Sequence, residues 1–418
     1  MGKTVALAGR PLEWAHAAFA EYYREARIDP PGRFARREFA AFPFTERTLM
    51  RRHASFSTAD ALHAFLAREA PRHVYYSCGY YRFPDHPTMA QKEWLGADLI
   101  FDLDADHLRG AERLGYPEQL ERVRDRARDL FDDFLVRDFG IPEDRMTIVF
   151  SGGRGYHIHV HDPAYWPLSS PERRELVDYI QGTGVAPDVG VDEVREGGPT
   201  DLGGSDDGDG GGGPGRPRTY HRLAPADAPG WRGRSGRAVR SLLERWDGLG
   251  AAGARDDMEA HGTPPGEARS LARSLVTEGR GRQIRTTGAL DVFPRGPPKG
   301  LLAAVIDRAR IEVQGETDAP VTTDIHRLIR LPGSLHGGTG FVVAPLDRAG
   351  LDRFDPWRDA TVPSPRGARA TVELVEPVDY PFPDGGVAGA PGDVRTVTPP
   401  VALFLVLRGE ARLPDGPG

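Results

Sequence analysis

The chain has 418 residues, 39% of them apolar, so it is long enough to bury a substantial core in about two or three structural units. Its formal net charge of −7 lacks the basic footprint usual in nucleic-acid-binding proteins, so any such binding must come from a local cluster. No apolar run approaches the roughly 20 residues that cross a bilayer, and residues 1–10 lack the apolar segment of a secretory signal. We therefore expect a cytoplasmic protein with no membrane association.

The basic residues and the cysteine content narrow the class further. Only Lys3, Lys92 and Lys299 are lysines among the 54 basic residues. Together with the acidic balance, this favours a halophile with a high-salt cytoplasm, although GC-rich coding would give the same arginine bias. The single cysteine, Cys78, excludes an internal disulfide and a metal site built from several thiolates. We expect Cys78 to be a small buried side chain.

The first part of the chain alternates helical and extended patterns. Apolar residues at helical spacing predict helices over 11–28, over 57–70 with Ser57 as its cap, and over 117–140. Extended or β-favouring runs cover 34–44, 72–81, 97–104, 146–150 and 156–160. This alternation predicts a mixed α/β unit.

The second part is interrupted by one stretch of low complexity. Helical patterns cover 170–184, 235–246, 266–276 and 299–313, the last running into a strand at 311–313. Between the first two lies the Gly/Asp-rich stretch 196–218, which cannot bury enough apolar surface to become ordered. We expect it to be a flexible loop. Residues 348–418 give no chemical signal.

Two carboxylates end the apolar run LIFDLD at residues 99–104. Side chains alternate across a strand, so Asp102 and Asp104 project from one face while Phe101 and Leu103 face the core. Like charges on one face repel unless a cation lies between them, and Mg²⁺ or Mn²⁺ prefers such oxygen ligands. Sugar-nucleotide transferases, aspartyl-phosphate phosphatases and polymerases all use this pair, and a solvated surface pair is also consistent with it.

A glycine-rich turn joins the next two predicted strands in SGGRGYHIHV, residues 151–160. Successive N–H groups of such a turn can cradle an anion, and Ser151 and Arg154 would add a hydroxyl and a guanidinium for phosphate. His157 and His159 lie on one face of the outgoing strand, and we expect His159 to be structural. A plain glycine-rich hairpin would explain the same pattern.

A basic segment near residue 330 provides a further group of candidates. Arg330 and His336 flank a Pro-Gly turn and could contact a polyphosphate, although a solvated helix end followed by a loop is the simpler alternative. Two-metal phosphoryl transfer commonly needs a third carboxylate. We favour Asp318, which follows the strand predicted at 311–313, over Asp324, which suits the N-cap of the helix-like segment 324–330.

Taken in order, the motifs resemble the small catalytic subunit of archaeal and eukaryotic DNA primase. They are LIFDLD, SGGRGYHIHV and TDAPVTTDIHRLIRLPGSLHG, and REFAAFPF and RRHASF are similar to that family's first strands. The resemblance spans about residues 10–345. It implies the primase fold, an α/β core of mixed sheets over 1–167 and 271–418, with an inserted helical subdomain over 168–270 that carries the 196–218 loop.

The resemblance also implies an activity and a site. The family starts new chains on single-stranded DNA from ribonucleotides and often deoxynucleotides. By position, the two catalytic Mg²⁺ or Mn²⁺ ions would be held by Asp102, Asp104 and Asp318. The incoming triphosphate would be bound by Ser151, Arg154, His157, Arg330, His336 and Arg52. The implied partner is the large primase subunit, which bears the family's iron–sulfur cluster, so no such cluster is expected in this chain.

The sequence departs from the family's pattern in two places. Many relatives carry a zinc knuckle after the acidic strand, but residues 105–145 hold no cysteine and only His107, so no zinc is expected. Arg330 stands where some relatives have lysine, and a guanidinium can still grip phosphate in a bidentate way.

Three alternative functions stay open. A primase-polymerase of end-joining repair would share the metal site, whereas an aspartyl-phosphate hydrolase would use Asp102 as a nucleophile. A non-catalytic nucleic-acid-binding subunit would have no need for intact acidic motifs. Primer length, the preference for ribo- or deoxynucleotides and the surface that meets the partner are not evident from the sequence.

Overall fold

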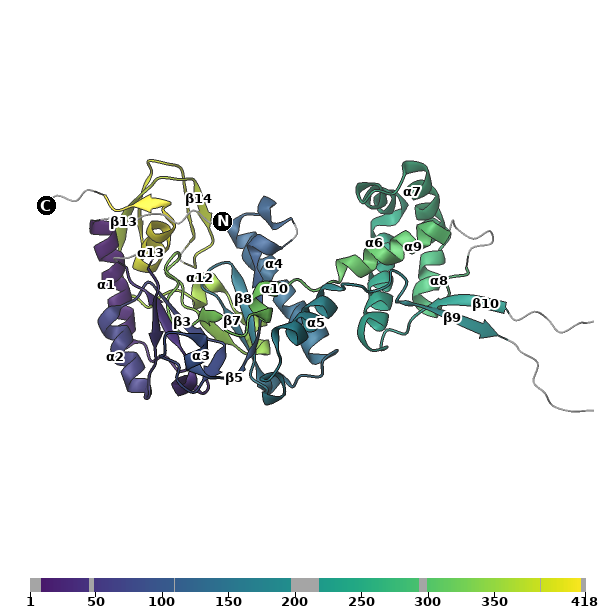
Figure 1. Ribbon diagram of the computed structural model, residues 1–418. Coiled ribbons are helices and arrows are strands. Elements are labelled where there is room, and N and C mark those ends of the chain that lie inside the picture. Colours follow the sequence, from purple (N-terminus) through teal and green to yellow (C-terminus); the bar gives the residue numbers. More distant parts are fainter. Residues whose placement is uncertain are drawn as a thin grey trace, which may run out of the picture. The chain divides into compact units, whose positions relative to one another are not determined.

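The computed structural model describes residues 9–44, 49–108, 110–196, 218–292, 299–383 and 385–414. It divides into two compact units (Figure 1), one formed by Met1–Val177 with Glu316–Gly418, the other by Asp178–Gly315. Helices and antiparallel sheets alternate along the chain, which confirms the mixed α/β class. No helix in the described ranges is long and apolar enough to span a membrane.

The N-terminal part of the first unit combines two helices with a four-stranded antiparallel sheet. The sheet has the order β11-β3-β1-β2, formed by Leu328–Arg330, His73–Ser77, Phe39–Phe42 and Arg51–Ala54. Helices α1 (Arg10–Glu25) and α2 (Ala59–Glu69) lie side by side (Figure 1) and share one apolar core with this sheet. Cys78 lies in that core, as expected. The cap of α2 is Thr58 rather than Ser57, because the Thr58 hydroxyl accepts the N–H of Ala61 at 3.2 Å.

A second four-stranded sheet carries the acidic and glycine-rich motifs. Its order is β12-β7-β8-β6, formed by Ala344–Leu346, Met146–Phe150, Gly155–Val160 and Leu99–Asp104. All pairs are antiparallel, and the register places Asp102 opposite His157 and Asp104 opposite Gly155. Helix α4 (Tyr116–Asp129), which continues as a π-helix over Leu130–Val136, packs on this sheet. Strands β6, β7 and β8 and helix α4 confirm the sequence predictions, whereas β12 was not predicted.

Shorter elements lie between and after the strands of the two sheets. Strands β4 (Gly79–Tyr81) and β5 (Trp94–Ala97) form a hairpin around α3 (Met89–Lys92), and α5 (Ser170–Gln181) and α10 (Ala319–Thr323) follow later in the chain. The extended run predicted over 34–44 is only partly correct, because Phe34–Arg36 forms a 3₁₀ turn before β1.

The C-terminal segment folds onto the first unit. It contains α11 (Arg348–Arg353), α12 (Pro356–Asp359), the sheet β16-β13-β17 of Val394–Val397, Ala370–Leu374 and Ala411–Arg412, and the hairpin of β14 (Val378–Tyr380) and β15 (Val387–Gly389). Helix α13 (Pro399–Arg408) is buried over residues 401–407, as expected for a helix that is apolar all round. Leu403 and Leu407 join the core shared by α1 and β3, so this segment is part of the first unit's framework.

The second unit is built on one long helix. Helix α6 (Gly230–Ala260), kinked at Gly250, shares an apolar core with α7 (Pro265–Ala272), α8 (Arg280–Thr287) and α9 (Lys299–Glu312). Strands β9 (Val191–Glu196) and β10 (Arg218–Leu223) pair antiparallel. This unit extends beyond the 168–270 expected for the insertion, because α8 and α9 also pack against α6. Of the stretch 196–218, residues 197–217 lie outside the described residues.

Two predictions of local structure, for the segments on either side of Asp318, were wrong. Residues 311–313 do not form a strand, because α9 continues to Glu312 and turns Val305, Ile306 and Ala309 into the second unit's core. The segment 324–330 is not a helix, because its last three residues pair with β3. Here the pairing of residues 328–330 with β3 outweighs the helix-like spacing of apolar residues in this segment. Asp324 therefore follows α10 instead of capping a helix.

Candidate active site

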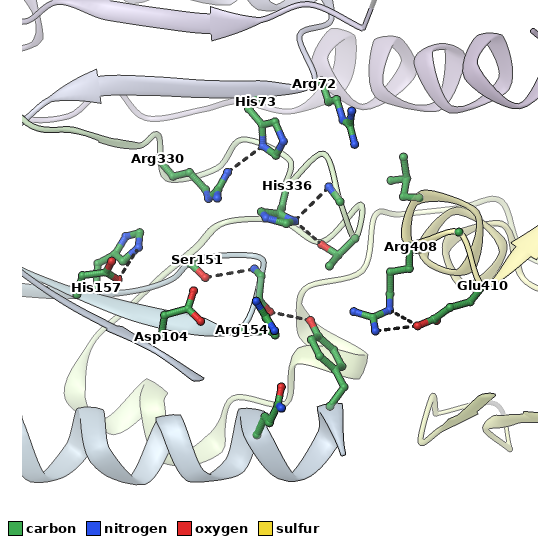
Figure 2. Close-up of a pocket in the computed structure, with 18 of the residues that line it drawn as sticks. Arg72, His73, Asp104, Ser151, Arg154, His157, Arg330, His336, Arg408 and Glu410 are labelled. Carbon is green, nitrogen blue, oxygen red and sulfur yellow. Dashed lines mark hydrogen bonds and ion pairs between the residues drawn. The ribbon is translucent and has the colours of Figure 1, made fainter. Parts of the chain in front are cut away.

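One large cavity opens in the first unit and has a volume of about 860 Å³. Seven of the residues predicted for the site line it: Asp102, Asp104, Ser151, Arg154, His157, Arg330 and His336. Figure 2 shows six of these side chains converging from β6, β8, the glycine-rich turn, β11 and the segment that follows β11. The structure thus brings together motifs that lie more than two hundred residues apart in the chain.

The two carboxylates of the acidic strand lie at its C-terminal end, half-buried. Burial, followed by the charges of Asp104 and Asp318, raises the pKa of Asp102 to about 7. Asp318 does not line the cavity, but its N–H donates to the carbonyl of Asp102 at 2.8 Å, and the hydroxyl of Thr317 donates to the same carbonyl at 3.2 Å. Asp318 is therefore held beside the acidic strand, within electrostatic reach of Asp102.

The donor atoms of this acidic group are suited to a hard cation. Within the described ranges, no three His, Cys, Asp or Glu side chains are arranged to hold a metal ion by themselves. Carboxylate oxygens that repel one another are nevertheless the ligands that Mg²⁺ uses, together with water and substrate phosphates. Asp102 and Asp104 offer such oxygen atoms to the cavity, and Asp318 as a third ligand stays a prediction. Asp324 is engaged differently, because its carboxylate accepts the N–H of His326 at 2.9 Å.

The glycine-rich turn is held by its own serine. The hydroxyl of Ser151 accepts the N–H groups of Gly153 and Gly155, each at 3.2 Å, and Arg154 pairs with Asp106. Gly152 has a φ of +72°, and a Cβ there would lie 2.7 Å from the Cβ of His336. The absence of a side chain at Gly152 therefore lets the turn pack directly against His336.

The histidines of the cavity are neutral. Burial, followed by the charge of Arg330, lowers the pKa of His157 to about 3 and holds the pKa of His336 well below its ordinary value. The Nε2 atom of His157 lies 3.2 Å from an Oδ1 of Asp102. Since the imidazole is uncharged at neutral pH, this contact is not an ion pair. The Nδ1 atom of His157 has no hydrogen-bond partner among the described residues.

Arg330 is positioned by β3. Its Nη1 donates to Nδ1 of His73 at 2.8 Å (Figure 2) and to the hydroxyl of Tyr75 at 3.2 Å. The His73 ring in turn meets the His336 ring edge-on, with centroids 5.2 Å apart. Sequence reasoning missed His73 and Tyr75, although the alternation of side chains in β3 places both on one face.

Arg52, like Asp318, does not line the cavity. Arg52 lies on β2, where its guanidinium makes two hydrogen bonds, of 2.9 and 3.2 Å, to the buried carboxylate of Glu38. Lys92 contacts the same carboxylate at 3.3 Å. Arg52 is absent from the cavity lining, and its role in nucleotide binding stays a prediction.

Gly155→Ala should destabilise the sheet that carries the acidic residues. A Cβ at this position would lie 2.3 Å from the carbonyl oxygen of Leu103, so β8 and β6 would have to separate. We expect the free energy of unfolding to fall by about 1–3 kcal/mol in chemical denaturation. Gly266→Ala is the control, because this helical glycine has open space around it and should not be destabilised. Equal stability of the two variants would contradict this close approach.

Comparison with known proteins gives consistent matches. The family described as DNA primase small subunit matches residues 101–348. The DNA primase small subunit PriS of Methanocella arvoryzae is 38% identical over 404 residues, covering 94% of this chain and 96% of that protein. PriS of Methanothrix thermoacetophila is 40% identical, covering 84% of this chain and 86% of its own length, and PriS of Halobacterium salinarum is 39% identical, covering 96% and 98%.

Proposed function

The chain belongs to the family of DNA primase small subunits, and from this premise we propose that it is the catalytic subunit of a DNA primase. It would synthesise short RNA primers on single-stranded DNA by nucleotidyl transfer, with deoxynucleotides as further substrates. The observation that carries the proposal is the single cavity shared by Asp102 and Asp104 with phosphate-binding groups of the glycine-rich turn and the Arg330 segment.

We assign the metal ligands to Asp102, Asp104 and Asp318. Bound Mg²⁺ or Mn²⁺ would activate the attacking 3′-hydroxyl and neutralise the charge that builds up on the triphosphate. The protein's own contribution would be to keep Asp318 beside the two carboxylates at the end of β6. The backbone bond between Asp318 and Asp102 supports this assignment, as does the raised pKa of Asp102.

The remaining residues of the cavity would bind and orient the triphosphate. Arg330 and Arg154 carry full positive charges and several N–H donors, which suit phosphate oxygens. Neutral His157 and His336 can each donate one hydrogen bond without adding charge. A bound phosphate chain would thus be fixed by directed donors on one side and carboxylates on the other.

The expected partners follow from the family. The relatives are named small subunits, which supports a large primase subunit as the partner of this chain. Base pairing would select the incoming nucleotide, so protein contacts with the template strand should be mostly with its backbone and by stacking. Such binding weakens as salt increases.

A primer-synthesis assay tests the proposal. The full chain, with and without a large subunit, is incubated with single-stranded DNA, labelled nucleotides and Mg²⁺ or Mn²⁺. We expect template-dependent oligonucleotides, formed more efficiently with the large subunit. Efficient initiation without that subunit would favour a repair primase-polymerase, and phosphate release without chain synthesis would favour a hydrolase. The absence of both would contradict an enzymatic role.

Arg330→Gln should weaken nucleotide binding more than turnover. Loss of a charge-assisted hydrogen bond to phosphate should raise the KM for nucleotides about tenfold to a hundredfold. Arg330→Lys should retain part of the affinity because the charge remains. The control is Arg353→Gln on the exposed end of α11. An unchanged KM in Arg330→Gln would show that this guanidinium does not contact the substrate.

A further inference from the structure

The C-terminal segment contributes a cation to the same cavity. Arg408, the last residue of α13, lines the cavity together with Asp104 and Arg154. Figure 2 shows its guanidinium extending from α13 toward Arg154, with Asp104 on the other side of Arg154. In this view, Arg154 of the glycine-rich turn therefore lies between the acidic residue and the side chain of Arg408.

An aromatic ring links Arg408 to the glycine-rich turn. The guanidinium carbon lies 4.4 Å from the centroid of the Tyr116 ring, within the range of a cation–π contact. The hydroxyl of Tyr116 donates to the carbonyl of Gly153 at 2.7 Å. One tyrosine side chain therefore spans the space between the turn that would hold phosphate and the guanidinium of Arg408.

Glu410 fixes the orientation of this guanidinium. Nε of Arg408 donates to one carboxylate oxygen of Glu410 at 2.9 Å, Nη2 lies 2.8 Å from the same oxygen in an ion pair, and the hydroxyl of Tyr380 donates to it at 2.8 Å. These contacts use two of the five N–H donors of a guanidinium, so Arg408 can bind Glu410 and a ligand oxygen at the same time. The second carboxylate oxygen of Glu410 is buried without a hydrogen-bond partner among the described residues.

We propose that Arg408 binds the terminal phosphate of the incoming nucleoside triphosphate and makes the site selective for triphosphates over diphosphates. The proposal rests on the function given above. The carboxylates would hold the end of the phosphate chain where the new bond forms, and the glycine-rich turn and His336 would hold its middle. A cation beyond the turn then meets only the last phosphate, which a diphosphate lacks.

Equilibrium binding of ATP and ADP to the full chain, with Mg²⁺ and without template, tests this assignment. In Arg408→Gln, the Kd for ATP should rise about tenfold while the Kd for ADP stays within about twofold. Arg408→Lys should retain part of the preference for ATP. Glu410→Gln should strengthen ATP binding several-fold, because it removes the opposing charge and keeps the accepting oxygen. Arg412→Gln, at the exposed residue of β17, is the control and should behave like the native chain.

Several outcomes would overturn the proposal. If Arg408→Gln weakens the binding of ATP and ADP equally, Arg408 has only a packing role. If the variant loses single-stranded DNA binding but binds ATP normally, Arg408 contacts a phosphate of the template strand instead. If Arg408→Gln does not fold, Glu410→Gln decides the question, since weaker or unchanged ATP binding would contradict the charge argument. Failure of the native chain to make primers would refute the proposed function but would not affect these turnover-free measurements.

Discussion

Asp102→Asn is expected to abolish nucleotide incorporation and, at the same time, to stabilise the metal-free protein. Incorporation should fall by at least about a thousandfold, because loss of one carboxylate weakens the metal-ion contribution of several kcal/mol to the transition state. Asp102 is mostly buried, and the charges of Asp104 and Asp318 oppose its ionisation. Removing this repulsion should raise the free energy of unfolding by about 1–3 kcal/mol.

The two readouts together separate this prediction from simple misfolding. Primer extension and thermal unfolding are measured on the same preparations, with single-stranded DNA binding as a check of the template site. Template binding should be unchanged, because the carboxylate faces the nucleotide cavity. Asp379→Asn is the matched control, since this exposed aspartate on β14 lies outside the cavity lining. Unchanged incorporation in Asp102→Asn would refute the assignment of the site.

Asp98→Ala should produce the largest loss of stability. Asp98 and Arg37 form an ion pair whose side chains are both fully buried. The guanidinium also donates to the carbonyls of Ser77 at 2.7 Å and Gly32 at 2.8 Å, so it cannot leave when its partner is removed. An uncompensated charge buried in this way costs about 3–5 kcal/mol. Asp98 directly precedes β6, so we expect Asp98→Ala to disrupt the strand that carries Asp102 and Asp104 as well.

Denaturant unfolding across pH checks this prediction. Burial alone would raise the pKa of Asp98, but the charge of Arg37 and the hydrogen bonds from His161 and Tyr80 hold the pKa below its ordinary value. The carboxylate therefore stabilises the fold above about pH 4, and its contribution is lost as the pH falls further. Glu373→Ala is the control, because its partner Arg412 is exposed and such pairs contribute about 1 kcal/mol or less. Similar losses in both variants would contradict the role of the buried pair.

Local sequence patterns predict most of the sheet that carries Asp102 and Asp104, and most residues of the candidate site. Alternation in LIFDLD places Asp102 and Asp104 on one face, and the glycine-rich turn sits between two short apolar strands. These features depend on residues a few positions apart, so a single sequence carries them. The resemblance to primase small subunits, which rests on the order of the motifs, is confirmed by the family match.

The parts that the sequence did not predict depend on partners distant in the chain. Residues 328–330 form a strand only because β3 is available to pair with them. Arg52 lies outside the cavity because it pairs with Glu38, which is buried just before β1. Arg408 reaches the cavity because α13 packs into the core shared by α1 and β3. Such contacts depend on tertiary packing and produce no periodic pattern in the local sequence.

Manganese binding measured by electron paramagnetic resonance, with a non-hydrolysable nucleoside triphosphate present, tests the central claim most directly. The native chain should bind about two manganese ions once the nucleotide is added. Asp102→Asn should lose most of this binding, and Asp379→Asn should retain it. Manganese binding that does not depend on Asp102, or nucleotide binding that recruits no manganese, would contradict an acidic strand that acts through metal ions.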